Sequence, residues 1–87
     1  MIHHITNILY VTFRSFGDIL VSTSIIRKLK EKHSNSIIDY YTTGICAPLL
    51  VGNPDINQIF TERNSPKQLE KYDIVLRPYR CLQETPF

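Results

Sequence analysis

Apolar residues follow two different spacings along this chain, and the change between them predicts the order of the elements. Residues 7–13 are apolar, β-branched or aromatic almost without interruption, as in a strand buried on both faces of a parallel sheet. Apolar residues then recur every three or four positions over about 18–32, which predicts a helix. The positions of this stripe are Ile19, Ser22, Ile25, Ile26 and Leu29. Turn-forming residues separate the helix from a second predicted strand, 37–42.

A strand, a helix and a strand within about forty residues predict a right-handed βαβ unit with a parallel strand pair. The later segments continue the alternation of strands and helices. They predict a short helix over 47–51, a strand over 56–61, a helical turn over 65–70 capped by Ser65, and a strand over 72–76. We therefore expect an α/β fold with a parallel, Rossmann-like sheet of about four strands.

From Arg77 onward the sequence shows neither helical nor strand periodicity, and no helix is predicted to cover the last strand. No internal repeat or linker-like segment divides the chain. We therefore expect residues 1–87 to form one partial domain, about half of a doubly wound unit. Missing strands would leave an exposed sheet edge, through which a homo-oligomer can form.

Composition narrows the class of protein. The formal charge of +2 is too small to predict nucleic-acid binding, and no apolar run is long enough to span a membrane, so a cytoplasmic protein is expected. Cys46 and Cys81 lack a C-x-x-C spacing and are expected to be reduced structural thiols. His3 and His4 are adjacent and would point to opposite faces of an extended segment, so we expect no metal site and no cofactor.

The loop after the first strand is the candidate site, because ligands of open α/β sheets bind beyond the carboxyl ends of the strands. This loop reads Arg14-Ser15-Phe16-Gly17-Asp18 and combines a cation, a hydroxyl, a glycine and a carboxylate at the start of a helix. Free N–H groups of a first helical turn bind oxyanions. The chain contains neither G-x-G-x-x-G nor G-x-x-x-x-G-K-[ST], which argues against dinucleotide and P-loop sites.

Each of these residues also has a purely structural interpretation. Asp18 is a favoured helix cap or first-turn acid. Arg14 is a surface cation or the partner of Asp18, and Ser15 satisfies the turn. The residues alone therefore predict an anion-facing loop and leave its chemistry open.

The order of the segments is similar to the start of glycosyltransferase family 9, which includes the lipopolysaccharide heptosyltransferases. The matching segments are Arg14-Ser15-Phe16-Gly17-Asp18-Ile19-Leu20, Ile25-Ile26-Arg27-Lys28-Leu29-Lys30, Ile37-Ile38-Asp39-Tyr40, Ala47-Pro48-Leu49-Leu50 followed by Gly52-Asn53-Pro54, residues 56–60, and Tyr72-Asp73-Ile74-Val75-Leu76. The resemblance covers most of the chain and implies the N-terminal, acceptor-side part of a GT-B fold.

By this resemblance, Asp18 corresponds to the general base that takes a proton from the acceptor hydroxyl. Arg14, Ser15 and Gly17 would line the acceptor pocket, with Arg14 facing an anionic saccharide or lipopolysaccharide-type acceptor. Arg77 and Arg80 would face the same cleft or solvent. A lipid-linked acceptor would place the protein at the inner face of a membrane.

Two departures limit the resemblance. The family commonly has a proline in the early helix where this chain has Ser24. The family's second domain, which binds the nucleotide-sugar donor, has no counterpart in these 87 residues, so the chain alone is not expected to catalyse transfer. The alternative is a small non-catalytic α/β module that binds an anion or a partner, in which Asp18 only stabilises the helix.

Overall fold

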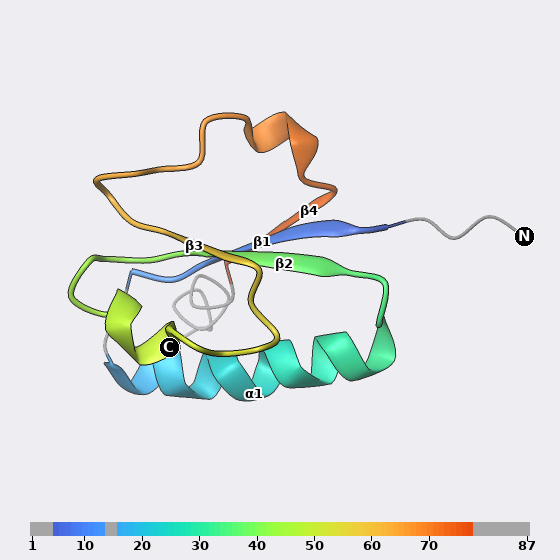
Figure 1. The fold of residues 1–87 in the computed structure, drawn as a ribbon, viewed down its shortest axis with the longest axis horizontal. Coiled ribbons are helices and arrows are strands. Elements are labelled where there is room, and N and C mark those ends of the chain that lie inside the picture. Colours follow the sequence, from blue (N-terminus) through green and yellow to red (C-terminus); the bar gives the residue numbers. More distant parts are fainter. Residues whose placement is uncertain (1–4, 14–15, 78–87) are drawn as a thin grey trace, which may run out of the picture.

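The computed structural model describes residues 5–13 and 16–77. Four strands form one parallel sheet in the order β3-β2-β1-β4, and helix α1 lies along one face (Figure 1). The elements in chain order are β1 Asn7–Val11, α1 Phe16–Lys32, β2 Ile37–Tyr41, the 3₁₀ helix η1 Ala47–Leu50, β3 Gln58–Phe60, the 3₁₀ helix η2 Leu69–Lys71 and β4 Ile74–Leu76. This arrangement confirms the predicted α/β, Rossmann-like fold.

The core lies between the sheet and α1. The central strands β1 and β2 pair in register, with Ile8 opposite Ile38 and Tyr10 opposite Tyr40. Because side chains of paired residues share a face, these four point toward the helix together. The buried cluster consists of Ile8, Tyr10, Ile19, Ile26, Ile38, Tyr40, Cys46 and Leu50.

A long connection covers the opposite face. Residues 61–73 cross from β3, at one edge of the sheet, to β4 at the other edge, and contain only η2 as regular structure (Figure 1). Beneath this connection lies Asp39 of β2, 6% exposed. Its two carboxylate oxygens accept hydrogen bonds from the Tyr72 hydroxyl at 2.6 Å and the Asn57 amide at 3.0 Å. The connection is thereby tied to the middle of the sheet.

The early elements lie where the sequence predicts them, with shifted ends. Helix α1 begins at Phe16, two residues before the predicted start, because Gly17 is helical rather than part of a preceding turn. Strand β1 ends at Val11, although the Thr12 amide still donates to the Tyr41 carbonyl at 3.0 Å. Strand β2 ends at Tyr41 instead of residue 42.

The later elements differ more from the prediction. Strand β3 spans three residues, because only Gln58–Phe60 pair with β2. The helical turn predicted over 65–70 is wrong: the 3₁₀ turn is Leu69–Lys71, its N-cap is Gln68, and no side chain caps it. Strand β4 begins at Ile74 rather than residue 72, because Tyr72 and Asp73 hold the connection to Asp39 and Asn7.

Candidate functional site

Asp18 lies at the edge of the sheet where the strands end. It is the third residue of α1, so it stands inside the first turn rather than at the cap, and it is half-buried. An acid in this position is stabilised by the positive end of the helix dipole. Gly17 precedes it, exposed and helical. The predicted partners Arg14 and Ser15 lie outside the described residues.

The negative charge of Asp18 acts on two buried phenols below it. Burial raises the pKa of Tyr10, and the neighbouring Tyr40 and Asp18 raise it further. Burial likewise raises the pKa of Tyr40, with a smaller contribution from Asp18. The Asp18 carboxylate is therefore close enough to the carboxyl halves of β1 and β2 to act on their tyrosines, although its own side chain is partly exposed to solvent.

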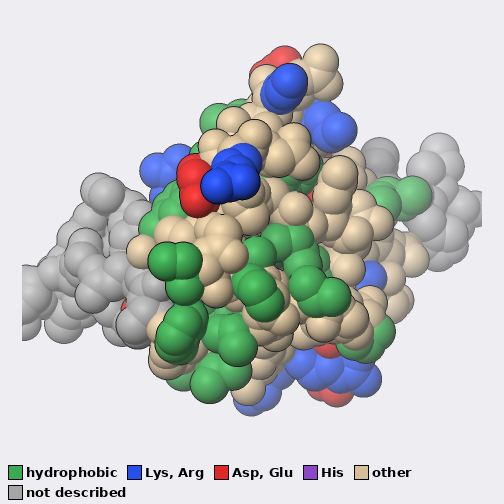
Figure 2. Space-filling view, turned by 60° about the vertical axis from the view of Figure 1, so that its left-hand side comes forward, with side chains coloured by type: hydrophobic (Ala, Val, Ile, Leu, Met, Phe, Trp, Pro, Cys, Tyr) green, Lys and Arg blue, Asp and Glu red, His purple; other side chains and the backbone are tan. Residues whose placement is uncertain are grey.

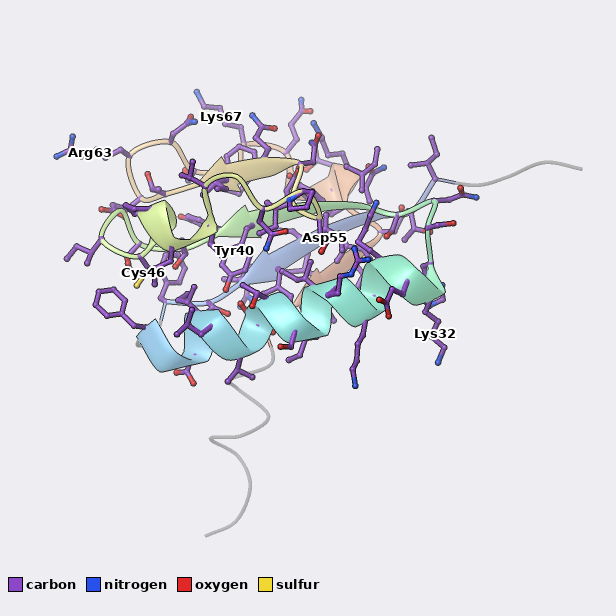
Figure 3. The ribbon with its side chains drawn as sticks, turned by 60° about the horizontal axis from the view of Figure 1, so that its bottom comes forward. Lys32, Tyr40, Cys46, Asp55, Arg63 and Lys67 are labelled. Atoms are coloured by element: carbon purple, nitrogen blue, oxygen red, sulfur yellow. The ribbon has the colours of Figure 1, made fainter. Side chains whose placement is uncertain are left out.

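A layer of buried hydroxyl groups lies between the first turns of α1 and the sheet. We call it the hydroxyl layer; its members are Tyr10, Thr12, Ser22, Tyr40 and Thr42, each at most 3% exposed. Figure 3 shows Tyr40 in the sheet above the helix, on the side where Cys46 lies. Sequence reasoning missed this layer. Ser22 in the apolar stripe of α1 was the one available signal, since a buried hydroxyl requires a partner.

One member of the layer lacks a partner. The Thr42 Oγ1 atom is the one buried side-chain nitrogen or oxygen without a hydrogen bond in the described part of the chain. Thr42 follows β2 and is fully buried, and its amide donates to the Phe60 carbonyl at 3.0 Å. An unsatisfied buried hydroxyl costs about 1–3 kcal/mol.

The exit loops of β2 and β3 are joined at the same edge. The Gly44 amide donates to the Glu62 carboxylate at 2.9 Å. A Cβ at position 44 would lie 3.3 Å from the other oxygen of that carboxylate, so a larger residue would press on the link. Arg77, at the exit of β4, is exposed, and Arg80 lies outside the described residues.

Exposed apolar side chains surround this edge. They come from the end of β1, the start of α1 and the region of η1, and they are Phe13, Phe16, Ile45, Leu49 and Val51. Figure 2 views the molecule from the side where the strands end and shows hydrophobic side chains gathered there. The edge of the sheet where the strands end therefore carries exposed apolar side chains as well as Asp18.

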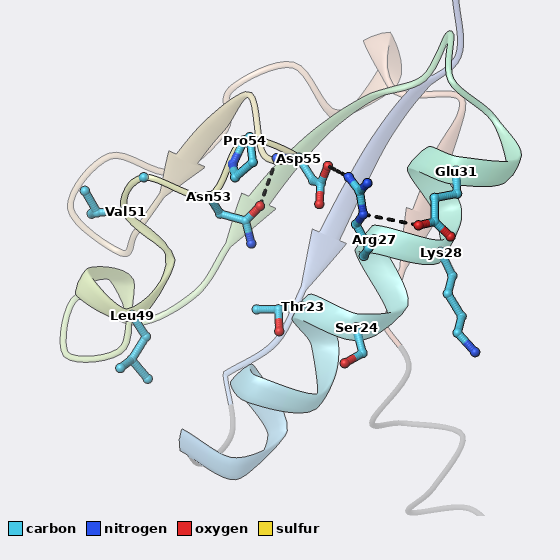
Figure 4. Close-up of a pocket in the computed structure, with 11 residues that line it drawn as sticks. Thr23, Ser24, Arg27, Lys28, Glu31, Leu49, Val51, Asn53, Pro54 and Asp55 are labelled. Carbon is cyan, nitrogen blue, oxygen red and sulfur yellow. Dashed lines mark hydrogen bonds and ion pairs between the residues drawn. The ribbon is translucent and has the colours of Figure 1, made fainter.

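A separate groove runs along one flank of α1. Its volume is about 720 Å³, and it lies between the middle of the helix and residues 51–55 (Figure 4). Arg27 bridges it, with nitrogen–oxygen distances of 3.0 Å to Asp55 and 3.3 Å to Glu31. Because these charges oppose one another, the groove offers a ligand little net charge. Neither Asp18 nor Gly17 lines this groove.

A smaller cavity of about 390 Å³ lies on the opposite face of the sheet, beneath residues 64–68. Its lining includes Lys67, Lys71 and Tyr72, none of which belongs to the predicted site. Within residues 5–13 and 16–77, no three His, Cys, Asp or Glu side chains gather as a metal site requires. The same residues contain no helix with the length and hydropathy of a membrane span.

The fold and the site define a small α/β protein with a parallel, Rossmann-like sheet and an acid at the start of its first helix. No protein-family model matches this chain, and comparisons with curated proteins and with solved structures found no match.

Proposed function

We propose that this chain is the acceptor-side portion of a glycosyltransferase that transfers a heptose-like sugar from a nucleotide-sugar to a saccharide or lipopolysaccharide-type acceptor. The observation that carries the proposal is the position of Asp18, in the first turn of α1 at the carboxyl edge of a parallel sheet. This edge is where open α/β sheets bind ligands. The ordered resemblance to glycosyltransferase family 9 supports it.

In this proposal Asp18 is the general base. Its carboxylate takes the proton of an acceptor hydroxyl while that oxygen bonds to the anomeric carbon of the donor. The bond from that carbon to the nucleotide phosphate breaks, and the phosphate leaves with the electron pair, which inverts the anomeric configuration. A short rigid link between a central strand and a helix suits this role, since a base must be held within hydrogen-bond reach of its proton.

The other groups bind the acceptor. Arg14 supplies positive potential toward an anionic acceptor, and Ser15 and Gly17 line its pocket. The donor requires a second α/β domain, so the proposal assigns binding without turnover to these 87 residues. It places the protein in the cytoplasm, at the inner face of a membrane where the acceptor is lipid-linked. A second copy of the chain, paired along one of the edge strands β3 and β4, is part of the same proposal.

A non-catalytic α/β module that binds an anion or a partner is the second candidate. The third position of a helix is where an acid stabilises the dipole, by about 0.3–1 kcal/mol, whether or not it binds anything. In that case replacing Asp18 changes stability slightly and affects no ligand.

Thermal unfolding of the whole chain with saccharide probes separates the two. The probes are a 2-keto-3-deoxy sugar acid, a hexose 6-phosphate and a neutral hexose. A ligand that binds only the folded state at one hundred times its Kd stabilises that state by about 2.7 kcal/mol. We expect an anionic probe to raise the Tm of the wild type. Asp18→Asn should lose most of this shift, because the hydroxyl of the bound probe donates a hydrogen bond to the Asp18 carboxylate, and its bond to a neutral amide is weaker.

Glu70→Gln is the matched control, because it also removes one carboxylate, from an exposed residue of η2 that precedes the amino end of β4. It should keep the full ligand-induced shift. If no probe moves the wild-type Tm, or if Asp18→Asn responds like the wild type, the acceptor-side assignment fails. The non-catalytic module is then the better description.

A further inference from the structure

A directed chain of hydrogen bonds runs through the hydroxyl layer. The Ser22 hydroxyl donates to the Ile19 carbonyl, one turn earlier in α1, at 2.5 Å. Its oxygen lies 2.6 Å from the Tyr40 hydroxyl. A serine hydroxyl has one hydrogen, and Ser22 uses it on the helix, so Tyr40 is the donor in the second bond.

The end of β1 lies beside the same phenol. The Thr12 side chain, which directly follows β1, interacts with the Tyr40 hydroxyl and lowers its pKa, against the larger effect of burial. The hydrogen-bonded chain itself joins the carboxyl half of β2 to the first turns of α1.

The Tyr40 ring is itself held in place. It is fully buried and stacks on the Tyr10 ring, with centroids 5.2 Å apart and planes inclined by 24°. The two tyrosines are opposite each other in the register of β1 and β2. The hydroxyl of Tyr40 thus has a defined position relative to both central strands.

We infer that Tyr40 is a positioning residue for Asp18, fixing the first turns of α1 over the sheet through the chain Tyr40–Ser22–Ile19. The inference rests on the proposed function, because position matters most if Asp18 is a base. Apolar contacts of Ile19 and Ile26 tolerate small slides of a helix, whereas short directed hydrogen bonds specify one register. Ile19 directly follows Asp18, so a shift of this turn moves the carboxylate with it.

The nearest matched control is Tyr10→Phe. Tyr10 has the same ring, shares the stack and is almost equally buried, but the chain to α1 runs through Tyr40. Tyr40→Phe removes the hydroxyl. It leaves the ring stack in place and breaks the hydrogen bond between Tyr40 and Ser22. Ser22→Ala breaks the same link from the helix side and serves if Tyr40→Phe does not fold.

The test is made on the whole chain, with two readouts. Residual dipolar couplings of backbone amides give the orientation of α1 relative to β1 and β2, without any ligand. Calorimetric titration, well below the Tm, gives the affinity for the anionic saccharide that binds the wild type. We expect Tyr40→Phe and Ser22→Ala to change the α1 couplings and to weaken the affinity about tenfold, with Tyr10→Phe within twofold of the wild type.

The two readouts separate this inference from the proposed function. If wild-type α1 couplings persist in both Tyr40→Phe and Ser22→Ala, the inference is overturned even where the Tm falls. If α1 turns in these variants but the affinity stays at the wild-type value, Tyr40 does not position Asp18 for binding and the inference is overturned again. If no saccharide binds the wild type, the proposed function fails, and a turned α1 still supports the positioning of Asp18 by Tyr40.

Discussion

Asp39 is the residue whose burial demands the most explanation. A carboxylate inside a parallel sheet is costly unless it is hydrogen-bonded. Asp39 accepts one bond from Asn57, which directly precedes β3, and one from Tyr72 in the connection between β3 and β4. The Tyr72 bond, at 2.6 Å, is the shorter one. Tyr72→Phe should therefore lower the free energy of unfolding by about 1.5–3 kcal/mol, the range for hydrogen bonds to charged groups. Urea denaturation followed by circular dichroism measures this.

Tyr41→Phe provides the comparison for Tyr72→Phe. Tyr41 is the next tyrosine of β2 and is half-buried, with its ring 4.8 Å from that of Phe13 in an edge-on contact. The substitution keeps this contact, so we expect a change within about 0.5 kcal/mol, as for most substitutions outside buried networks. Equal losses in the two variants would show that the Asp39 bond contributes nothing specific.

At the scale of elements, helix α1 has a narrow buried face, so that adjacent residues differ greatly in exposure. Ile26 is fully buried, while the adjacent Ile25 is 37% exposed. Both belong to the apolar stripe predicted from the sequence, but only one faces the sheet. Ile26→Ala should lower the free energy of unfolding by about 2–5 kcal/mol, because it leaves a cavity in the core. Ile25→Ala should cost less than about 1 kcal/mol, and equal costs in urea denaturation would contradict this register of the helix.

The elements that could be predicted from sequence are those whose pattern is local. The apolar run of β1 and the helical spacing of α1 each extend over enough residues to define their type. The turn at η2 could not be predicted, because its place depends on Tyr72 reaching Asp39, which is 33 residues away in the chain.

The candidate site was likewise predicted only in part. Asp18 was predicted from its place after the first strand, and it does lie in the first turn of α1. The hydroxyl layer was not, because it requires knowing that Tyr10 and Tyr40 are opposite each other in register and that Ser22 faces them. Register is a property of the assembled sheet, and strands buried on both faces carry little alternation from which to read it.

For the whole molecule, the phenols of three tyrosines make the free energy of unfolding depend on pH in the alkaline range. Burial is the main cause that raises the pKa of Tyr10, Tyr40 and Tyr72, and the hydrogen bond to Asp39 adds to it at Tyr72. The unfolded chain releases these protons near the ordinary tyrosine pKa of about 10, whereas the folded chain retains them. The stabilisation is therefore complete below pH ~10 and is lost as the pH rises above it.

Urea denaturation between pH 8 and 11 should accordingly show an unfolding free energy that falls progressively above pH ~10. Other effects of alkaline pH are common to all variants, so the decisive quantity is the difference between them. The unfolding free energies of Tyr72→Phe and Tyr40→Phe should each decline less steeply than that of the wild type, since each variant lacks one phenol. Tyrosinate absorbance near 295 nm follows the same protons directly. If both variants decline in parallel with the wild type, Tyr40 and Tyr72 do not determine the alkaline limit of this fold.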